Sequence, residues 1–424
     1  MVVAGEASGD LHGAGLCAAI RTLSPGARVF GMGGERMRAA GAELLADVSR
    51  RATVGGTEAV SGVPALYRIF RRLRRVLEEE HPDVLVLIDF PEFNLRLARV
   101  ARRAEIPVVY FVPPQIWAWR RGRIRTIRRL VSLVLAAFPF ERALYRDAGV
   151  AVEFVGHPLV DGLAAAPSRA AARRALDLAA DAPVVGLLPG SRPGEVARML
   201  PLMRETAVRL SARWPTARFV VAQAPTLDGP LVQEIIGGTP GIGIVHDATP
   251  AVIRAADLLL VTSGTATLEA ALLGTPMVVC YKLSRTSELL GRMTLRVPWI
   301  SLVNIVLGRR VVPELFERRH VTVDRIVKEA AALLADTEAR TAQLAAFAEL
   351  RAQLGEPGVG LRAAHILLGG GLRPPISTTE GLGSPPEGAS PRTATGRRAP
   401  SGALLPASPE DQDCAGEARA RTRQ

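Results

Sequence analysis

The chain has 424 residues, 48% of them hydrophobic, which is long for one domain and sufficient for two domains with separate cores. Its 53 Lys and Arg against 41 Asp and Glu give a net charge of +12, which favours anionic partners such as phosphates, nucleic acid or an acidic membrane surface without choosing among them. Three cysteines without paired spacing argue against a disulfide framework or a zinc site, and no apolar run reaches the roughly 18 residues of a membrane span.

A glycine-rich turn follows the first apolar segment of the chain. Residues 1–4 predict a strand that is truncated, since only three residues follow the initial Met before Gly5. The turn GEASGDLHGAGL then continues into a helix, and a second turn, GMGGERM at 31–37, follows another short strand. Neither turn is a Walker motif, because no GK[ST] follows the glycines. Turns of this kind at the carboxyl end of a strand suit a phosphate or a sugar.

Residues 60–77 carry apolar side chains at helical spacing and arginines on the remaining face. This pattern predicts a basic amphipathic helix. Such a helix either packs on a core with a solvated arginine face or lies at an interface with anionic lipid. The residues expected to contact lipid in the second case are Ile69, Phe70, Arg71, Arg72 and Arg75.

Two further features follow predicted strands of this half. VLVLID at 84–89 brings Asp89 to the end of a buried strand, where a carboxylate is placed for acid–base chemistry, for substrate hydroxyls or merely for capping a helix. The loop PPQIWAW follows the strand at 108–112, and its Trp117 and Trp119 precede four arginines. These rings suit stacking on bases, anchoring at a lipid interface or packing in a core. A strand at 152–161 completes an alternating α/β half.

The alternating pattern restarts at Val184, after an Ala- and Arg-rich linker helix at 164–181. The turn PGSRPGEV contains Arg192, whose guanidinium fork matches two oxygens of a diphosphate. Because this turn also precedes a helix, it repeats the organisation of the first half. The sequence therefore predicts two successive α/β halves, each with a glycine-rich turn after its first strand.

A second turn of this half joins the strand at 258–261 to a helix through Ser263, Gly264 and Thr265. The free N–H groups at that helix N-terminus suit a phosphate, and Glu269, one turn later, suits the hydroxyls of a ribose. The alternative is an ordinary βαβ crossover with a glycine-rich turn.

The remainder of the chain changes in character. Asn304 lies between apolar residues and has no evident structural role. Helices are expected at 323–350 and 359–368. From Gly369 onward the chain is rich in Pro, Gly, Ser and Thr, which predicts disorder.

The motifs occur in the order AGEASGDLHGA, GMGGERM, VLIDFPEFN, PPQIWAW, VGHPLVD, LLPGSRPGEV, TSGTATLEAALLGTPMVV and SLVNIVLGRRVVPE. This ordered set resembles the lipid-A-disaccharide synthase family from position 2 to about position 368. The resemblance implies an α/β fold of the glycosyltransferase B type, with two Rossmann-like domains facing a cleft and a disordered C-terminal tail. It implies an acceptor-side and membrane-side domain at 1–168, a UDP-sugar domain at 181–345, helices at 346–368 that return to or are exchanged with the first domain, and a tail at 369–424.

The reaction implied is an inverting hexosyl transfer. The 2,3-diacylglucosamine of a UDP conjugate passes to the 6-hydroxyl of 2,3-diacylglucosamine 1-phosphate, called lipid X, which forms a β-1,6 bond and releases UDP. No metal or cofactor is expected, because protein groups neutralise the diphosphate. By their place in the motifs, Arg192 and the turn of Ser263, Gly264 and Thr265 would hold the diphosphate, and Glu269 the ribose. Asn304 would act near the donor, and Ser8, Glu6 and Asp89 belong to the first domain, with Asp89 favoured over Glu6 as the general base.

The resemblance also implies a cytoplasmic protein that is peripheral at the inner face of the cytoplasmic membrane. There the helix at 60–77 and the loop with Trp117 and Trp119 would meet anionic lipid, and the C-terminal helices would form a homodimer. Another UDP-sugar enzyme of this fold, such as a UDP-N-acetylglucosamine 2-epimerase or a muramyl-lipid transferase, is the alternative enzyme. A non-catalytic nucleic-acid-binding protein is an alternative of another class, but it leaves the UDP-type turn unexplained, so no nucleic-acid partner is expected.

Overall fold

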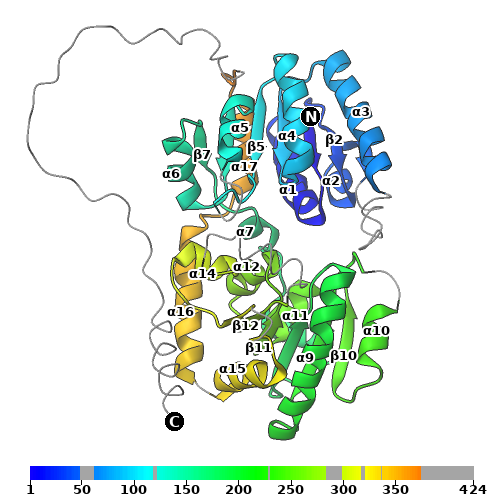
Figure 1. Ribbon diagram of the computed structural model, residues 1–424, viewed down its shortest axis with the longest axis vertical. Helices are drawn as coiled ribbons and strands as arrows, with labels where there is room; N and C mark the ends of the chain where they lie inside the picture. Colours follow the sequence, from blue (N-terminus) through cyan, green and yellow to red (C-terminus); the bar gives the residue numbers. More distant parts are fainter. Residues whose placement is uncertain are drawn as a thin grey trace, which may run out of the picture. The chain divides into compact units, whose positions relative to one another are not determined.

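Two parallel β-sheets with helices packed on them make up the computed structural model (Figure 1). The structure describes residues 1–47, 62–117, 122–227, 230–282, 298–316, 320–335 and 337–373. The tail expected to be disordered lies outside these residues from position 374 onward. In the described chain, no helix combines the length and the apolar character needed to cross a bilayer.

The first sheet has seven parallel strands in the order β3-β2-β1-β4-β5-β6-β7. The strands are β1 (Val2–Ala4), β2 (Phe30–Gly33), β3 (Glu43–Asp47), β4 (Leu85–Ile88), β5 (Val108–Phe111), β6 (Leu133–Ala136) and β7 (Val152–Phe154). The short strand β1 lies inside the sheet between β2 and β4. At position 31 a Cβ would lie 1.9 Å from the carbonyl oxygen of Val2, so glycine is required for β2 to approach β1.

Helices cover both faces of this sheet. They are α1 (Ala7–Leu23), α2 (Glu35–Ala39), α3 (Gly62–Glu80), α4 (Pro91–Arg103), α5 (Arg123–Leu130), α6 (Pro139–Asp147) and α7 (Leu159–Gly162). The central strands are apolar along their whole length because both faces are buried. We refer to residues 1–162 as the N-terminal half.

The second sheet has six parallel strands in the order β10-β9-β8-β11-β12-β13. The strands are β8 (Val184–Leu188), β9 (Arg218–Gln223), β10 (Ile242–His246), β11 (Leu258–Val261), β12 (Met277–Cys280) and β13 (Glu314–Leu315). The helices are α8 (Arg169–Ala175), α9 (Pro193–Arg213), α10 (Leu231–Ile236), α11 (Thr249–Ala255), α12 (Thr265–Leu272), α14 (Leu302–Leu307), α15 (Val323–Ala335) and α16 (Thr337–Gln353). We refer to residues 169–353 as the C-terminal half.

The last described helix, α17 (Val359–Leu368), packs against α1 of the N-terminal half. The Asp161 carboxylate accepts hydrogen bonds from the N–H groups of Gly358 and Gly360, at 2.7 and 3.0 Å, and so caps α17. Gly360 lies so close to α1 that a Cβ there would stand 2.8 Å from the carbonyl oxygen of Gly15. The chain therefore returns from the second sheet to the first.

Three expectations about local structure need correction. The strand expected at 152–161 ends at Phe154, because Gly156 adopts a φ of +92° and α7 begins at Leu159. The helix expected at 323–350 is two helices, α15 and α16. The helix expected to be a linker is α8, which packs on α11 and belongs to the C-terminal half.

Asp257, the residue before β11, holds α8 in place. Its carboxylate accepts hydrogen bonds from Arg169 at 2.6 Å, from Arg173 at 2.8 Å and from the N–H of Val184 at 2.9 Å. Arg173 is only 5% exposed, and it also donates to four backbone carbonyls. A buried guanidinium needs a full set of acceptors, so Asp257 joins α8, β8 and β11 into one unit.

Replacing Asp257 with Ala should lower the free energy of unfolding of the C-terminal half by about 3 kcal/mol, because the cation of Arg173 would stay buried without its carboxylate. Urea denaturation followed by circular dichroism measures this loss. Asp324→Ala is the matched control, since it removes an exposed carboxylate paired with Arg209 and should cost less than about 1 kcal/mol. Equal losses in the two variants would contradict this role of Asp257.

Candidate functional site

Each sheet has one point where the strand order reverses. In the first sheet the chain runs from β1 outward to β2 and β3, and from the neighbouring β4 outward to β5, β6 and β7. Ligands of open parallel sheets bind outside the carboxyl ends of the strands at such a switch point. Glu6 follows β1 and Asp89 follows β4, so the two predicted carboxylates lie at the switch point of the N-terminal half.

The backbone of Asp89 is held in a strained turn. Asp89 and Phe90 both have a φ of +45°, a conformation that non-glycine residues rarely adopt. The Asp89 carbonyl oxygen accepts hydrogen bonds from the Asn94 amide and the Tyr110 hydroxyl, both at 2.7 Å. The Phe90 ring also fills the space where a Cβ on Gly5 would stand, at 2.2 Å from that position. The turn is therefore fixed through its backbone carbonyl, and among the described residues no side chain donates a hydrogen bond to the carboxylate, which has only the Phe90 backbone N–H.

The protonation of Asp89 is shifted toward neutral pH. Burial raises the pKa of this carboxyl to about 6 and the nearby Glu6 carboxylate acts in the same direction, whereas a hydrogen bond from the Phe90 backbone N–H and the charge of Arg192 act against them. A general base is most effective when its pKa lies close to the pH at which it works. A carboxyl group at this position and with this pKa is suited to accepting a proton.

Glu6 and Ser8 lie at the start of α1, and Asp10 fixes this segment. Glu6 is exposed and Ser8 is half-buried. Asp10 is buried and accepts hydrogen bonds from the N–H groups of Gly34, Arg36 and Met37 at 2.6 to 3.1 Å. This carboxylate caps α2 and ties the two glycine-rich turns of the N-terminal half together. The sequence motif alone does not reveal this role.

The C-terminal half repeats the arrangement at β8 and β11. The chain runs from β8 to β9 and β10 on one side, and from β11 to β12 and β13 on the other. Arg192 follows β8 and occupies the N-cap position of α9, where its exposed guanidinium lies 3.6 Å from the Glu195 carboxylate and 3.9 Å from that of Glu6. The predicted cation thus lies at the second switch point and within reach of a group of the first.

The turn after β11 opens α12 toward the same edge of the sheet. Gly264 has a φ of +152°, which suits glycine, and no side chain of the described residues caps the N-terminus of this helix. The Ser263 hydroxyl donates to the carbonyl oxygen of Ile300 at 2.7 Å. Its proton is therefore in use, so the first turn of α12 offers an anion chiefly backbone N–H groups, including that of Thr265.

Glu269 lies in the second turn of α12 and is half-buried. Burial raises the pKa of its carboxyl, and Arg36 of the N-terminal half acts in the opposite direction. No described residue donates a hydrogen bond to the Glu269 side chain in this structure. A buried carboxylate without a donor is suited to sugar hydroxyls, which supply donors.

Asn304 does not lie open to a ligand. It is 0% exposed, and its oxygen accepts hydrogen bonds from the N–H groups of Val311 and Val312. Its amide nitrogen donates to the carbonyl oxygen of Val312 and to the Glu314 carboxylate. These four bonds use the donors and acceptors of the amide, so Asn304 supports the loop at 311–314 in this structure, and its catalytic role near the donor stays a prediction.

Trp117 is also buried, at 7% exposure, which favours core packing among the alternatives stated for it, while its contact with lipid stays an untested prediction. Its ring packs edge-to-face on Phe138 and Phe140. Its indole N–H donates to the Glu141 carboxylate at 3.2 Å, which meets the need of a buried indole for a partner. Burial raises the pKa of Glu141 to about 7. Trp119 lies outside the described residues.

The predicted amphipathic helix is α3, and its apolar face packs largely on the core. Ile69 and Phe70 are half-buried, and the Phe70 ring lies 5.7 Å from that of Phe93 in an edge-to-face contact. The exposed side carries the arginines predicted for it: Arg68, Arg71, Arg72, Arg74 and Arg75. Tyr67, at 61% exposure, is the large apolar side chain that this helix leaves to solvent.

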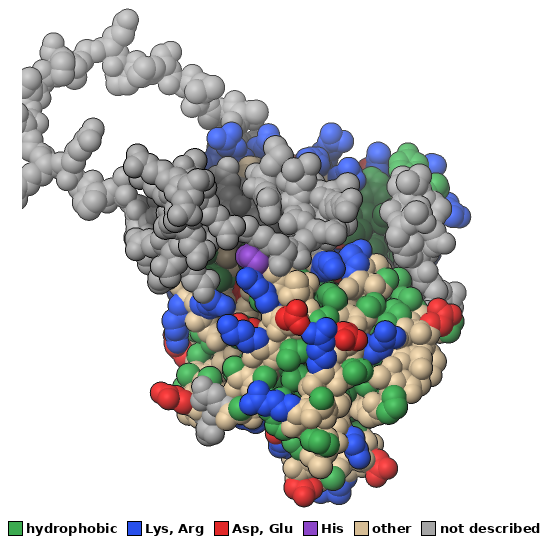
Figure 2. Space-filling view, turned by 60° about the horizontal axis from the view of Figure 1, so that its bottom comes forward, with side chains coloured by type: hydrophobic (Ala, Val, Ile, Leu, Met, Phe, Trp, Pro, Cys, Tyr) green, Lys and Arg blue, Asp and Glu red, His purple; other side chains and the backbone are tan. Residues whose placement is uncertain are grey.

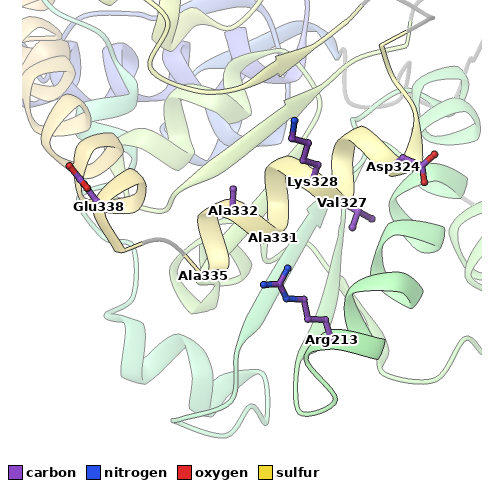
Figure 3. Close-up of a pocket in the computed structure, with 8 residues that line it drawn as sticks. All are labelled: Arg213, Asp324, Val327, Lys328, Ala331, Ala332, Ala335 and Glu338. Carbon is purple, nitrogen blue, oxygen red and sulfur yellow. The ribbon is translucent and has the colours of Figure 1, made fainter.

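A surface pocket of about 800 Å³ lies elsewhere, between the C-terminal end of α9 and α15 (Figure 3). Arg213 and Lys328 line it together with Asp324 and Glu338. Arg213 ends the 21-residue helix whose N-cap position is Arg192, which places the pocket roughly 30 Å from Arg192.

The described residues also contain no group of three His, Cys, Asp or Glu side chains that could hold a metal ion. The switch points are therefore the candidate site.

Solved structures share this architecture. The chain resembles a UDP-GlcNAc 2-epimerase from Neisseria meningitidis with a TM-score of 0.56 and 14% identity, over 87% of this chain and 98% of that one. It resembles the calicheamicin glycosyltransferase with a TM-score of 0.55 and 17% identity, over 87% and 96%. At such identities the likeness concerns the fold, and it confirms the predicted α/β fold of the glycosyltransferase B type.

Sequence comparison is more specific. A family model described as Lipid-A-disaccharide synthetase matches residues 1–364. The chain is 45% identical over 372 residues to the lipid-A-disaccharide synthase of Myxococcus xanthus, and 43% identical over 369 residues to that of Geobacter sulfurreducens. Each match covers 87% of this chain and 96% of the relative. The chain therefore belongs to the lipid-A-disaccharide synthetase family and is a hexosyltransferase of lipid A biosynthesis.

Proposed function

We propose that the C-terminal half holds UDP-2,3-diacylglucosamine and that the N-terminal half activates the 6-hydroxyl of lipid X. The single observation that carries this division is the placement of Asp89 and Arg192 at the switch points of the two sheets. One group is a carboxylate with a pKa of about 6, and the other is a permanent cation. Transfer of a sugar from a nucleotide needs both a base and a countercharge for the leaving group.

On the donor side, the diphosphate lies against Arg192 and the first turn of α12. The guanidinium binds two oxygens at once, and the N–H groups of Gly264 and Thr265 add the positive end of the helix dipole. Glu269, further along α12, accepts hydrogen bonds from the ribose hydroxyls. This arrangement neutralises the charge that develops on UDP as the bond to the sugar breaks.

On the acceptor side, the oxygen of the 6-hydroxyl attacks the anomeric carbon, and Asp89 takes the proton of that hydroxyl. Inversion requires the attack to come from the face opposite the leaving UDP. The base and the diphosphate-binding groups stand on different halves of the chain, which supports that geometry. Glu6 supports both groups. Its charge raises the pKa of Asp89. Its carboxylate lies near Arg192, and the diphosphate takes the place of that carboxylate when the nucleotide binds.

Replacing Asp89 with Asn should remove turnover while UDP binding is kept, because the amide cannot accept the proton. We expect a loss of at least about a hundredfold in kcat. In the unchanged protein, kcat/KM should fall about tenfold for each pH unit below about 6, since Asp89 becomes protonated there. The measurement is the release of UDP from the two lipid substrates across pH 5 to 8.

Glu105→Gln is the control for this variant, because Glu105 is an exposed carboxylate in the turn that follows α4, away from the switch point. Its rate and pH profile should match those of the unchanged protein. If Asp89→Asn kept a near-normal rate, the base would be another group and Glu6 would be the next candidate.

Replacing Arg192 with Ala should weaken UDP binding by about ten- to a hundredfold, which is the effect of losing charge-assisted hydrogen bonds. Arg192→Lys should lose part of this affinity, because an ammonium cannot bind two oxygens as a fork. Isothermal titration calorimetry with UDP gives both values. Arg213→Ala, at the other end of α9, should bind UDP normally, and a normal affinity in Arg192→Ala would refute the assignment.

We also propose that the exposed arginines of α3 attract the protein to anionic lipid. Arg68, Arg71 and Arg72 have no acidic partner among the described residues, whereas Arg74 pairs with Glu78 and Arg75 lies 3.9 Å from Glu79. On the C-terminal half, by contrast, the face in Figure 2 shows basic, acidic and apolar side chains interspersed. Since Ile69 and Phe70 pack on the core, the attraction is mainly electrostatic and involves Tyr67 at most as an apolar anchor.

Replacing Arg68, Arg71 and Arg72 together with Gln should weaken binding to phosphatidylglycerol vesicles at least tenfold, because each arginine contributes about 1 kcal/mol near an anionic surface. UDP affinity should not change. The control replaces Arg174, Arg213 and Arg218, three exposed arginines of the C-terminal half, which removes the same charge elsewhere. Equal sedimentation of both triple variants with vesicles would assign α3 to core packing alone.

The homodimer through the C-terminal helices remains a proposal. In this structure α17 packs on α1 of its own chain. An exchanged α17 would make the same contacts on a second copy, and the segment from Leu354 to Gly358 is where the path of the chain would differ.

A further inference from the structure

The described segment 298–316 is organised around one acidic side chain, Glu314 of β13. Strand β13 is the edge strand next to β12, with Glu314 beside Val279 and Leu315 beside Cys280. Glu314 is half-buried, and it is the last residue of the motif SLVNIVLGRRVVPE, although no role was predicted for it. A half-buried carboxylate needs hydrogen-bond donors, and Glu314 has three of them.

Each oxygen of the Glu314 carboxylate is used. One oxygen accepts from the N–H of Ile300 at 2.8 Å. The other accepts from the N–H of Ser301 at 3.0 Å and from the Asn304 amide at 2.7 Å. These bonds fix the residues just before α14 and the first turn of that helix. Glu314 thus determines where the backbone at 300–301 lies.

That backbone contacts the donor turn. The carbonyl oxygen of Ile300, whose own N–H is bound to Glu314, accepts the hydroxyl of Ser263 at 2.7 Å. Ser263 directly precedes the glycine that opens α12. A continuous set of hydrogen bonds therefore runs from the edge strand through Ile300 to the turn. Asn304 binds Glu314 as well, and it also binds the backbone of Val311 and Val312.

We propose that Glu314 is a positioning residue that sets the donor turn for the diphosphate of the nucleotide, and that it acts through Ile300 and Ser263. The inference rests on the proposed binding of UDP at this turn. Glu314 itself does not touch the nucleotide. Hydrogen bonds to the first residues of a binding turn fix its geometry, and small displacements of such a turn weaken binding strongly.

The substitution Glu314→Gln tests this with little change of shape. The glutamine amide has one acceptor oxygen and one NH₂ group, so at least one of the N–H groups of Ile300 and Ser301 would face another donor. We expect UDP to bind about tenfold more weakly, which corresponds to the loss of a hydrogen bond to a charged group. Glu349→Gln, which removes an exposed carboxylate paired with Arg309 in the same half, should bind UDP normally.

A double-mutant cycle separates positioning from general destabilisation. The dissociation constant of UDP is measured by calorimetry for the full-length chain and for Glu314→Gln, Ser263→Ala and the double variant, with thermal melting as a check of folding. Both substitutions break the same set of hydrogen bonds. The double variant should therefore bind UDP about as well as whichever single variant has the lower UDP affinity. The proposal would be overturned if the losses of UDP affinity in the two single variants multiplied in the double variant. It would also be overturned by an unchanged UDP affinity in Glu314→Gln.

Two further outcomes have a defined meaning. If the unchanged protein and Glu349→Gln bind UDP, and Arg192→Ala weakens binding while Glu314→Gln does not, the inference fails and the proposed function stands. If the unchanged protein binds no UDP, both fail. Should Glu314→Gln not fold, Glu314→Asp takes its place, since it keeps the charge and shortens the reach by one methylene. Normal UDP affinity in a folded Glu314→Asp would then count against the proposal.

Discussion

Two pairs of neighbouring parallel strands, β1 with β4 and β8 with β11, determine where the chemistry of this molecule can take place. A parallel sheet brings the carboxyl ends of its strands to one edge, and only where the strand order reverses do the following helices diverge enough to leave room for a ligand. Glu6 and Asp89 follow the first pair, and Arg192 and Ser263 follow the second. The other candidate groups depend on this placement. Asp89 has a raised pKa because its strand ends in a buried turn beside Glu6, and α12 presents free N–H groups because β11 ends where it does.

The described chain contains three acidic side chains whose pKa burial raises to about 6 or 7, and their surroundings separate their roles. Glu141 and Glu314 each accept hydrogen bonds from three protein groups, which commits their oxygens to holding a loop or a turn. At Asp89 the Asn94 amide and the Tyr110 hydroxyl bind the backbone carbonyl instead, and within the described chain the carboxylate has only the backbone N–H of Phe90 as a donor. A raised pKa therefore identifies a base only when the oxygens remain available, and this distinction favours Asp89 for proton transfer.

Much of the site could be predicted from the sequence because strand ends are readable. A short apolar run followed by a polar residue and a helix signal places Asp89, Arg192 and the turn at Ser263 each at the carboxyl end of a strand, without knowledge of the fold. The burial and the hydrogen-bond partners of Asn304 and Trp117 could not be predicted in this way. Whether an amide or an indole is open to a ligand depends on partners far along the chain, here Val312 with Glu314, and Glu141. The capping of α2 by Asp10 and the role of Glu314 were missed for that reason too, since no local pattern marks a carboxylate that accepts backbone N–H groups 24 residues away or in a preceding loop.

The central claim is that one half of the chain holds the nucleotide and the other removes the proton, so that turnover needs both lipid substrates. The most direct measurement is the release of UDP by the purified full-length protein from UDP-2,3-diacylglucosamine with and without lipid X, with the anomeric configuration of the product read by NMR. The account predicts UDP release only when lipid X is present, and a product with a β-1,6 linkage. Absence of UDP release from folded protein that binds UDP, or a product with an α linkage, would contradict it.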